Sequence, residues 1–151
     1  LTEGSVDIAI LYRPQHRAGF KIKQIFEEEI VLVSSLDQGI DIFDHDYIFV
    51  NWGPEFISDH ALNFPNLTTP RVSLDLGTLG IEYLLTTPSS GYFPRRIADS
   101  FVNEGKLWYV DWAPKFIYPA YIIYAEDIET DLIKVILKGI SVLRKEMMTA
   151  T

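Results

Sequence analysis

Short, nearly continuous apolar segments alternate along the chain with longer segments in which apolar residues recur every three or four positions. A continuous apolar segment bounded by polar residues is typical of a strand that is buried on both faces. An alternation of apolar and polar residues, as at 72–76, indicates a strand with one face that is more polar than the other. Strands are therefore predicted at 6–12, 30–33, 47–50, 72–76 and 118–124.

Four other segments have the apolar spacing of helices, at 54–64, 77–85, 94–103 and 128–147. The third begins with a proline and is followed by a glycine, which fits the usual asymmetry of helix ends. The fourth has acidic residues at its start and basic residues later, which complements the helix dipole. Strands that alternate with helices predict an α/β fold with a largely parallel sheet. Pro119 suggests that the last strand lies at a sheet edge or that a strand starts there, because proline donates no backbone hydrogen bond.

The composition narrows the range of functions. The 151 residues are 48% hydrophobic and include no cysteine, so the chain can bury a core without disulfides and has no thiolate for metal binding or nucleophilic catalysis. The formal net charge of −8 disfavours direct binding to nucleic acid. Because no apolar segment approaches the roughly 20 residues that a membrane span needs, we expect a soluble protein.

Two polar segments, 34–46 and 111–116, look like connections between lobes. If both segments connect one lobe to the other, the part of the chain between them forms a lobe that is inserted into the sequence of the first lobe. We therefore predict a first lobe made of 1–33 and 117–151, and a second lobe, with its hinge segments, at 34–116. The first lobe has few elements and the chain opens with what looks like the end of a helix, so we expect further sequence upstream.

Four motifs resemble, in the same order, those of the effector-binding domain of LysR-type transcriptional regulators. Residues 1–10 (LTEGSVDIAI) are similar to the family's helix end followed by a G-x-x-D-x-A-I strand, and 26–33 (FEEEIVLV) to its L-x-x-E-x-L-V-L-V strand. Residues 91–94 (GYFP) with 105–110 (GKLWYV) are similar to G-I-A-x-L-P followed by G-x-L-x-x-V. The strand at 118–124 and the last helix resemble the family's return to the first lobe. The chain departs from the family's G-x-G-I-A at 89–93, which reads SSGYF.

The resemblance implies a type 2 periplasmic-binding-protein-like fold with two lobes, the first of them incomplete here. It implies that a small metabolite, an organic acid or an amino-acid-like effector, binds between the lobes, with no catalysis and no cofactor. In the family, DNA is bound by a separate N-terminal helix-turn-helix domain, which this sequence does not contain, and the full-length protein is a homodimer or homotetramer in the cytoplasm. Two alternatives stay open: a fragment of an extracytoplasmic solute-binding protein with the same fold, or a small α/β enzyme.

Candidate ligand-binding residues follow predicted strands or begin predicted helices, where ligands of open α/β sheets bind. They are Tyr12, Arg13, Asn51, Trp52, Gly53, Gly77, Thr78 and Ser90. Tyr12 stands where the family often turns a side chain toward the effector, and the Arg13 guanidinium could pair with a carboxylate. The alternative for Arg13 is an ordinary surface arginine before a turn.

The segment from Asn51 to Gly53 combines an amide, an indole and the free backbone N–H groups of a helix start, which bind anions. Alternatively, Asn51 caps the helix and Trp52 fills a gap in the core. Gly77 and Thr78 open the next helix and have the same two interpretations. Ser90 could line the cleft or be a turn serine.

No motif indicates a metal or a cofactor. The three histidines, His16, His45 and His60, lack the spacing that places two ligands on one helix face. The sequence has no Gly-x-Ser-x-Gly elbow, P-loop or dinucleotide-binding fingerprint. We therefore expect a metal-free and cofactor-free binding domain.

Overall fold

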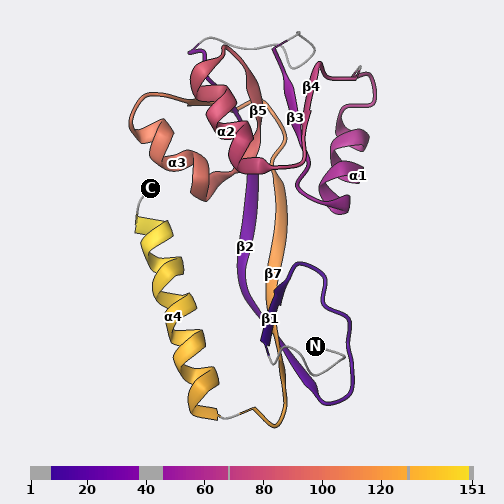
Figure 1. Cartoon of the computed structure of the whole chain (residues 1–151), viewed down its shortest axis with the longest axis vertical. Helices are drawn as coiled ribbons and strands as arrows, with labels where there is room; N and C mark the ends of the chain where they lie inside the picture. The colour runs from indigo at the N-terminus through magenta and orange to yellow at the C-terminus, as the bar shows by residue number, and fades with distance from the viewer. Residues whose placement is uncertain (1–7, 38–45, 68, 129, 150–151) are drawn as a thin grey trace. The chain divides into compact units, whose positions relative to one another are not determined.

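The computed structural model describes residues 8–37, 46–67, 69–128 and 130–149 (Figure 1). The N-terminal motif up to position 7 and His45 lie outside the described residues. The chain divides into two compact units: unit 1 consists of Leu1–Glu28 and Ile117–Thr151, and unit 2 of Glu29–Phe116.

Unit 1 is built from three strands and one long helix. Its elements are β1 (Ile8–Leu11), the first part of β2 (Phe20–Ser34), most of β7 (Phe116–Ala125) and α4 (Thr130–Thr149). β7 lies between β1 and β2 and is antiparallel to β1. The core of this unit forms where Ile25, Ala120 and Ile122 pack against the apolar side of α4.

Unit 2 contains the remaining elements. They are β3 (Ile48–Val50), α1 (Pro54–Asn63), β4 (Val72–Leu74), α2 (Gly77–Thr86), β5 (Ser90–Pro94), α3 (Arg95–Asn103) and β6 (Trp108–Tyr109). The second part of β2 pairs with β5 and β6 in antiparallel fashion. β3 and β4 are parallel, and a parallel bridge from Tyr47 to Ser90 links β3 to β5.

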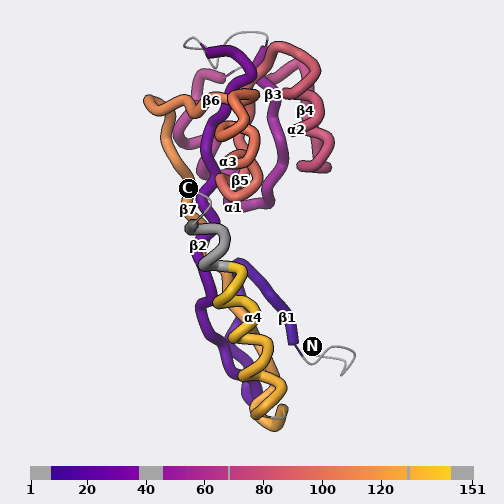
Figure 2. The backbone as a smooth tube through the Cα atoms, turned by 90° about the vertical axis from the view of Figure 1, so that its left-hand side faces the viewer, coloured from indigo at the N-terminus to yellow at the C-terminus, as the bar shows by residue number. Residues whose placement is uncertain are grey.

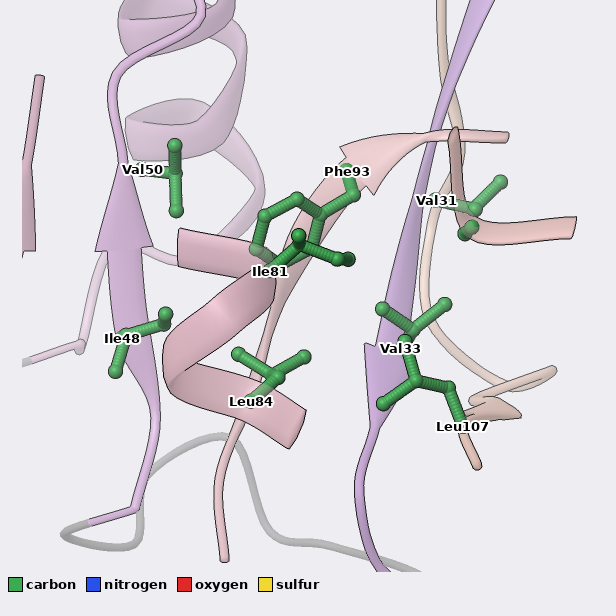
Figure 3. Packing of buried hydrophobic residues seen from close by; sticks show 9 residues of the cluster. Val31, Val33, Ile48, Val50, Ile81, Leu84, Phe93 and Leu107 are labelled. Carbon is green, nitrogen blue, oxygen red and sulfur yellow. The ribbon is translucent and has the colours of Figure 1, made fainter. Parts of the chain in front are cut away.

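The strands of unit 2 are covered on both faces. Because successive residues of a strand point to opposite faces, Phe93 and Tyr92 of β5 belong to different clusters. Phe93 packs with Ile81 and Leu84 of α2 and with residues of β2 and β3 (Figure 3). Tyr92 points to the α1 side, where its ring centroid lies 5.8 Å from that of Phe56. The continuous apolar segments of this unit therefore correspond to strands buried on both faces, as predicted.

The four predicted helices are confirmed with small shifts of their ends. α3 begins at Arg95 with Pro94 as its N-cap, and Gly105 beyond its end has a positive φ of 74°. Such a φ costs glycine little because glycine has no Cβ. The structure also contains β5, β6 and the first ten residues of β2, none of which was predicted as a strand.

The expected largely parallel sheet is wrong for the larger sheet. Its described pairings are antiparallel in β1 with β7, β2 with β5 and β2 with β6, whereas parallel pairing is confined to β3, β4 and the start of β5. An apolar strand indicates burial on both faces, and burial alone does not determine the direction of the neighbouring strand.

Two expectations for unit 1 are also wrong. In the described part of the first strand, Ile10 is 57% and Leu11 42% exposed, so β1 is not covered on both faces. Of the two interpretations of Pro119, the edge strand is wrong, because β7 lies between two strands, whereas the other, a position near a strand start, is compatible with a β7 that begins at Phe116. The structure accommodates this proline because the β1 register ends at Tyr121, so Pro119 lies outside that ladder.

Candidate ligand-binding site

Three helices of unit 2 begin at the same edge of its strands. β3, β4 and β5 point in one direction, so their C-terminal ends meet at one edge. α1, α2 and α3 each begin within a few residues of those ends. In open α/β sheets, ligands bind at the carboxyl ends of parallel strands. We call this edge of unit 2 the carboxyl edge.

The loop after β3 is joined to the loop after β4 by Asn51. Its backbone N–H donates to the Leu74 carbonyl at 2.9 Å, and its side-chain Nδ2 donates to the Asp75 carboxylate at 3.2 Å. Its Oδ1 accepts the Gly53 N–H at 2.9 Å. Because Gly53 is the N-cap of α1, the interpretation of Asn51 as the cap is wrong. Gly53 has a φ of 107°, which favours glycine at this turn.

Trp52 is fixed by a hydrogen bond from its indole N–H and by packing of its ring. The indole Nε1 donates to the Tyr92 carbonyl at 2.7 Å, and the ring makes a T-shaped contact with the Phe93 ring at a centroid distance of 5.9 Å. A Cβ added to Gly77 would lie only 2.1 Å from the far end of this ring. The contacts support the interpretation in which Trp52 fills space in the core, and they explain why residue 77 has no side chain.

The start of α2 combines polar and apolar groups. Its N-cap, Leu76, makes no side-chain capping bond, and its first turn has no acidic residue. The first N–H groups of any helix lack an acceptor within the helix. Thr78 and Asp75 are exposed beside these groups, and the side chains of Leu76 and Leu79 are exposed as well. The carboxyl edge therefore offers a carboxylate, helix N–H donors and an apolar rim.

Ser90 lies apart from the other candidates of unit 2. It stands at the start of β5, the end opposite to the carboxyl edge, and is fully buried. Its Oγ is the only buried side-chain oxygen or nitrogen without a hydrogen-bond partner among the described residues. Asn51, Gly53, Gly77 and Thr78 are thus brought together with the ring of Trp52, while Ser90 is not. Tyr12 and Arg13 belong to unit 1, where both are exposed and both interact with other groups.

A charged cluster at the start of α3 was missed from the sequence. Arg95 donates to the Glu29 carboxylate at 3.0 Å, and Lys115 lies 3.5 Å from the same oxygen. The Arg95 guanidinium also stacks 4.5 Å from the Tyr109 ring centroid, and the Tyr109 hydroxyl donates to Asp99. Burial, followed by the bond to Asp99, raises the pKa of Tyr109 above its usual value. No sequence signal links these residues, since Arg95 follows Glu29 by 66 positions.

His60 is a core residue. Its Nε2 lies 2.7 Å from the Tyr47 hydroxyl, and its ring packs among Phe49, Phe56 and Phe64. Burial lowers the pKa of His60 to about 4, so the ring is neutral at pH 7. Within the described ranges, no group of three or more potential metal ligands occurs, and no helix is long and apolar enough to cross a membrane.

No family model and no curated protein matches this sequence. Solved structures do match. The regulatory domain of HypT from Salmonella typhimurium aligns with a TM-score of 0.73 and 13% identity, over 97% of this chain and 76% of that domain. The regulatory domain of CrgA, a LysR-type regulator from Neisseria meningitidis, aligns with a TM-score of 0.68 and 17% identity, over 93% of this chain and 76% of that one.

Full-length regulators also align. The structure of LysG from Corynebacterium glutamicum with its bound effector Arg gives a TM-score of 0.67 and 15% identity, over 91% of this chain and 50% of that protein. The chain spans 54% of full-length HypT, which is described as a hypochlorite-specific LysR-type transcriptional regulator. The fold is therefore an α/β fold of the type 2 periplasmic-binding-protein class. More particularly, it is the fold of LysR-type regulatory domains, which confirms the fold that the sequence motifs implied.

Proposed function

We propose that this chain senses a small metabolite as the effector-binding part of a LysR-type transcriptional regulator, and that it acts by binding rather than by catalysis. The observation that carries this proposal is the carboxyl edge of unit 2. Asn51, Asp75 and the start of α2 converge there, in a fold shared with regulatory domains. Units 1 and 2 would then correspond to the two predicted lobes.

The chemistry of the carboxyl edge favours an amino acid as the effector. Asp75 supplies an exposed carboxylate that can accept an ammonium group, and Asn51 orients it at 3.2 Å. The N–H groups of Gly77 and Thr78 can receive a carboxylate, since a helix start favours negative charge. Exposed Leu76 can contact an apolar part of the ligand. A plain dicarboxylate fits this edge less well, because Asp75 would repel it.

The remaining assignments belong to the same proposal. Tyr12 and Arg13 are proposed as the contribution of unit 1 to effector binding. DNA would be bound by a separate domain of the complete regulator, which would work as an oligomer in the cytoplasm. Binding would bias that oligomer only if the effector has different affinities for two conformations.

Isothermal titration of the chain with the twenty L-amino acids and with succinate, citrate and benzoate tests the proposal. We expect an L-amino acid to bind saturably. Asp75→Asn keeps the size of the side chain but removes its charge, and should weaken that binding about tenfold or more, as expected for a lost charge-assisted bond. Glu82→Gln, the same charge change farther along α2, is the matched control and should bind as the original chain does.

Each other result has a defined meaning. If an organic acid binds and Asp75→Asn strengthens its binding, the effector is an organic anion and not an amino acid. Amino-acid binding unaffected by Asp75→Asn would move the site away from the carboxyl edge. Turnover of a bound compound would overturn the proposal of a purely binding function.

A further inference from the structure

The segment from residue 8 to residue 26 has a charge opposite to that of the whole chain. It contains Arg13, Arg17, Lys21 and Lys23 and no acidic residue, whereas the complete sequence has 13 basic and 21 acidic residues. The segment comprises β1, the loop after it and the start of β2 (Figure 2). The formal net charge of −8 is therefore unevenly distributed, and unit 1 has a local basic surface.

Three of these residues form one group at the start of β2. Lys21 and Lys23 are two positions apart in the strand, so they point to the same face at a separation of about 7 Å. Arg17 is joined to the start of β2 by a turn, in which the Phe20 N–H donates to the Arg17 carbonyl at 3.3 Å and Gly19 has a φ of 85°. We call Arg17, Lys21 and Lys23 the β2 basic group.

The β2 basic group is available to a partner. All three residues are exposed, and within the described ranges none of their side chains forms an ion pair or a hydrogen bond. Glu126 lies beside the turn, where its backbone N–H donates to the Gly19 carbonyl at 2.8 Å, but its carboxylate forms no ion pair with the described members of the group. Arg13 differs from the group, because it interacts with other groups. The described part of the chain therefore leaves the three charges of the β2 basic group without a counter-ion.

The surroundings of the β2 basic group favour a polyanion as the partner. Among the described residues, the exposed large apolar side chains include Ile10, Leu11 and Tyr12 but none from 13 to 35. A protein interface has an apolar centre, whereas contacts with a phosphate backbone need only charge and hydrogen bonds. Duplex DNA carries one negative charge about every 1.7 Å along its axis, so each of the three cations can meet a phosphate.

We propose that the β2 basic group contacts the phosphate backbone of duplex DNA. This contact rests on the proposed function, in which a separate domain of the complete regulator holds the chain beside DNA. A tethered second contact acts at an effective concentration that reaches the millimolar range, so it adds to binding even when its own affinity is low. The contact is independent of base sequence, because phosphates carry no sequence information.

Fluorescence anisotropy of a short labelled duplex, titrated with the 151-residue chain at several salt concentrations, tests the proposal. We expect weak binding, with a dissociation constant on the order of 10⁻⁴ M at low salt, because the acidic remainder of the chain repels DNA. The logarithm of the binding constant should fall linearly with the logarithm of the salt concentration. Its slope should be about −2.7, since each of three phosphate contacts contributes about −0.9.

Two double variants locate the contact. Lys21→Gln combined with Lys23→Gln removes two charges, should weaken binding at low salt about tenfold or more, and should reduce the slope to about −0.9. Arg71→Gln combined with Lys106→Gln is the matched control, because both residues are exposed in unit 2 and the same total charge is removed. This control should leave the slope unchanged. Circular dichroism would check that both variants are folded.

Three results would overturn the proposal. The first is a chain that does not bind the duplex at the lowest salt concentration. The second is an equal loss of binding in the two double variants, which would show that net charge and not the β2 basic group determines binding. The third is tighter binding to poly-L-glutamate than to the duplex, which would indicate an acidic protein as the partner. The amino-acid titration is a separate measurement on unit 2, so failure of DNA binding is distinguishable from failure of effector sensing.

Discussion

Replacing Gly77 by alanine is expected to destabilise unit 2 through a single steric conflict. The new Cβ would lie 2.1, 2.6 and 2.9 Å from three atoms of the Trp52 ring. The ring cannot move freely, because its Nε1 donates to the Tyr92 carbonyl at 2.7 Å and the ring makes a T-shaped contact with Phe93. Overpacking of this kind costs about 1–3 kcal/mol, and losing the indole hydrogen bond adds about 0.5–1.5 kcal/mol. The expected loss in the free energy of unfolding is about 2–4 kcal/mol.

Urea unfolding followed by circular dichroism measures this loss, with Gly139→Ala as the matched control. Gly139 is also helical, but its added Cβ meets no atom within 4 Å, so this variant should gain up to about 1 kcal/mol from helix propensity. Trp52→Phe removes the ring atoms that clash, so Gly77→Ala should cost less in that background. If Gly77→Ala unfolds at the same urea concentration as the original chain, the packing argument for Trp52 and Gly77 is refuted.

Two more predictions concern buried polar groups of unit 2. Because burial lowers the pKa of His60 to about 4, the unfolded state binds a proton between about pH 6.5 and 4 that the folded state does not. The free energy of unfolding should therefore decrease as the pH is lowered from about 6.5 to 4, by up to about 3 kcal/mol. His60→Phe should lose that part of the pH dependence, and identical pH profiles for the two proteins would contradict the prediction. Ser90→Ala removes a buried hydroxyl that lacks a partner in the described structure, so it should leave stability unchanged or raise it by about 1 kcal/mol. A loss above about 1 kcal/mol in thermal or urea unfolding would show that the Ser90 hydroxyl is hydrogen-bonded after all.

Local patterns were sufficient for the four helices and for the apolar second part of β2, β3 and β4, but not for β5, which is fully buried and was not predicted as a strand. The period of apolar residues, proline at position 94 and glycine at 105 located α3 within one residue of its observed start. Motif order gave the correct fold even though no solved structure cited above exceeds 17% identity. These features could be predicted because each depends on neighbouring residues along the chain.

The candidate site could be predicted only in part. The segments that begin α1 and α2 were identified from their helix-start signals. Asp75 was missed, because its role depends on Asn51, which lies 24 positions away in the sequence. Ser90 was grouped with the other candidates, but the strand direction of β5 places it at the opposite end from the carboxyl edge.

The sequence by itself determined where the chain forms helices and where several apolar strands lie, because periodicity and capping act over a few residues, and the order of its family-like motifs indicated the fold. Only the tertiary structure decided strand direction, the central position of β7 and the partners of Trp52 and Arg95. Strand pairing and side-chain packing join residues that are distant in the chain, and the apolar pattern of each segment is compatible with several partners. The helix α4 illustrates the difference, because the sequence shows a helix with many apolar residues and the packing shows which of them remain uncovered.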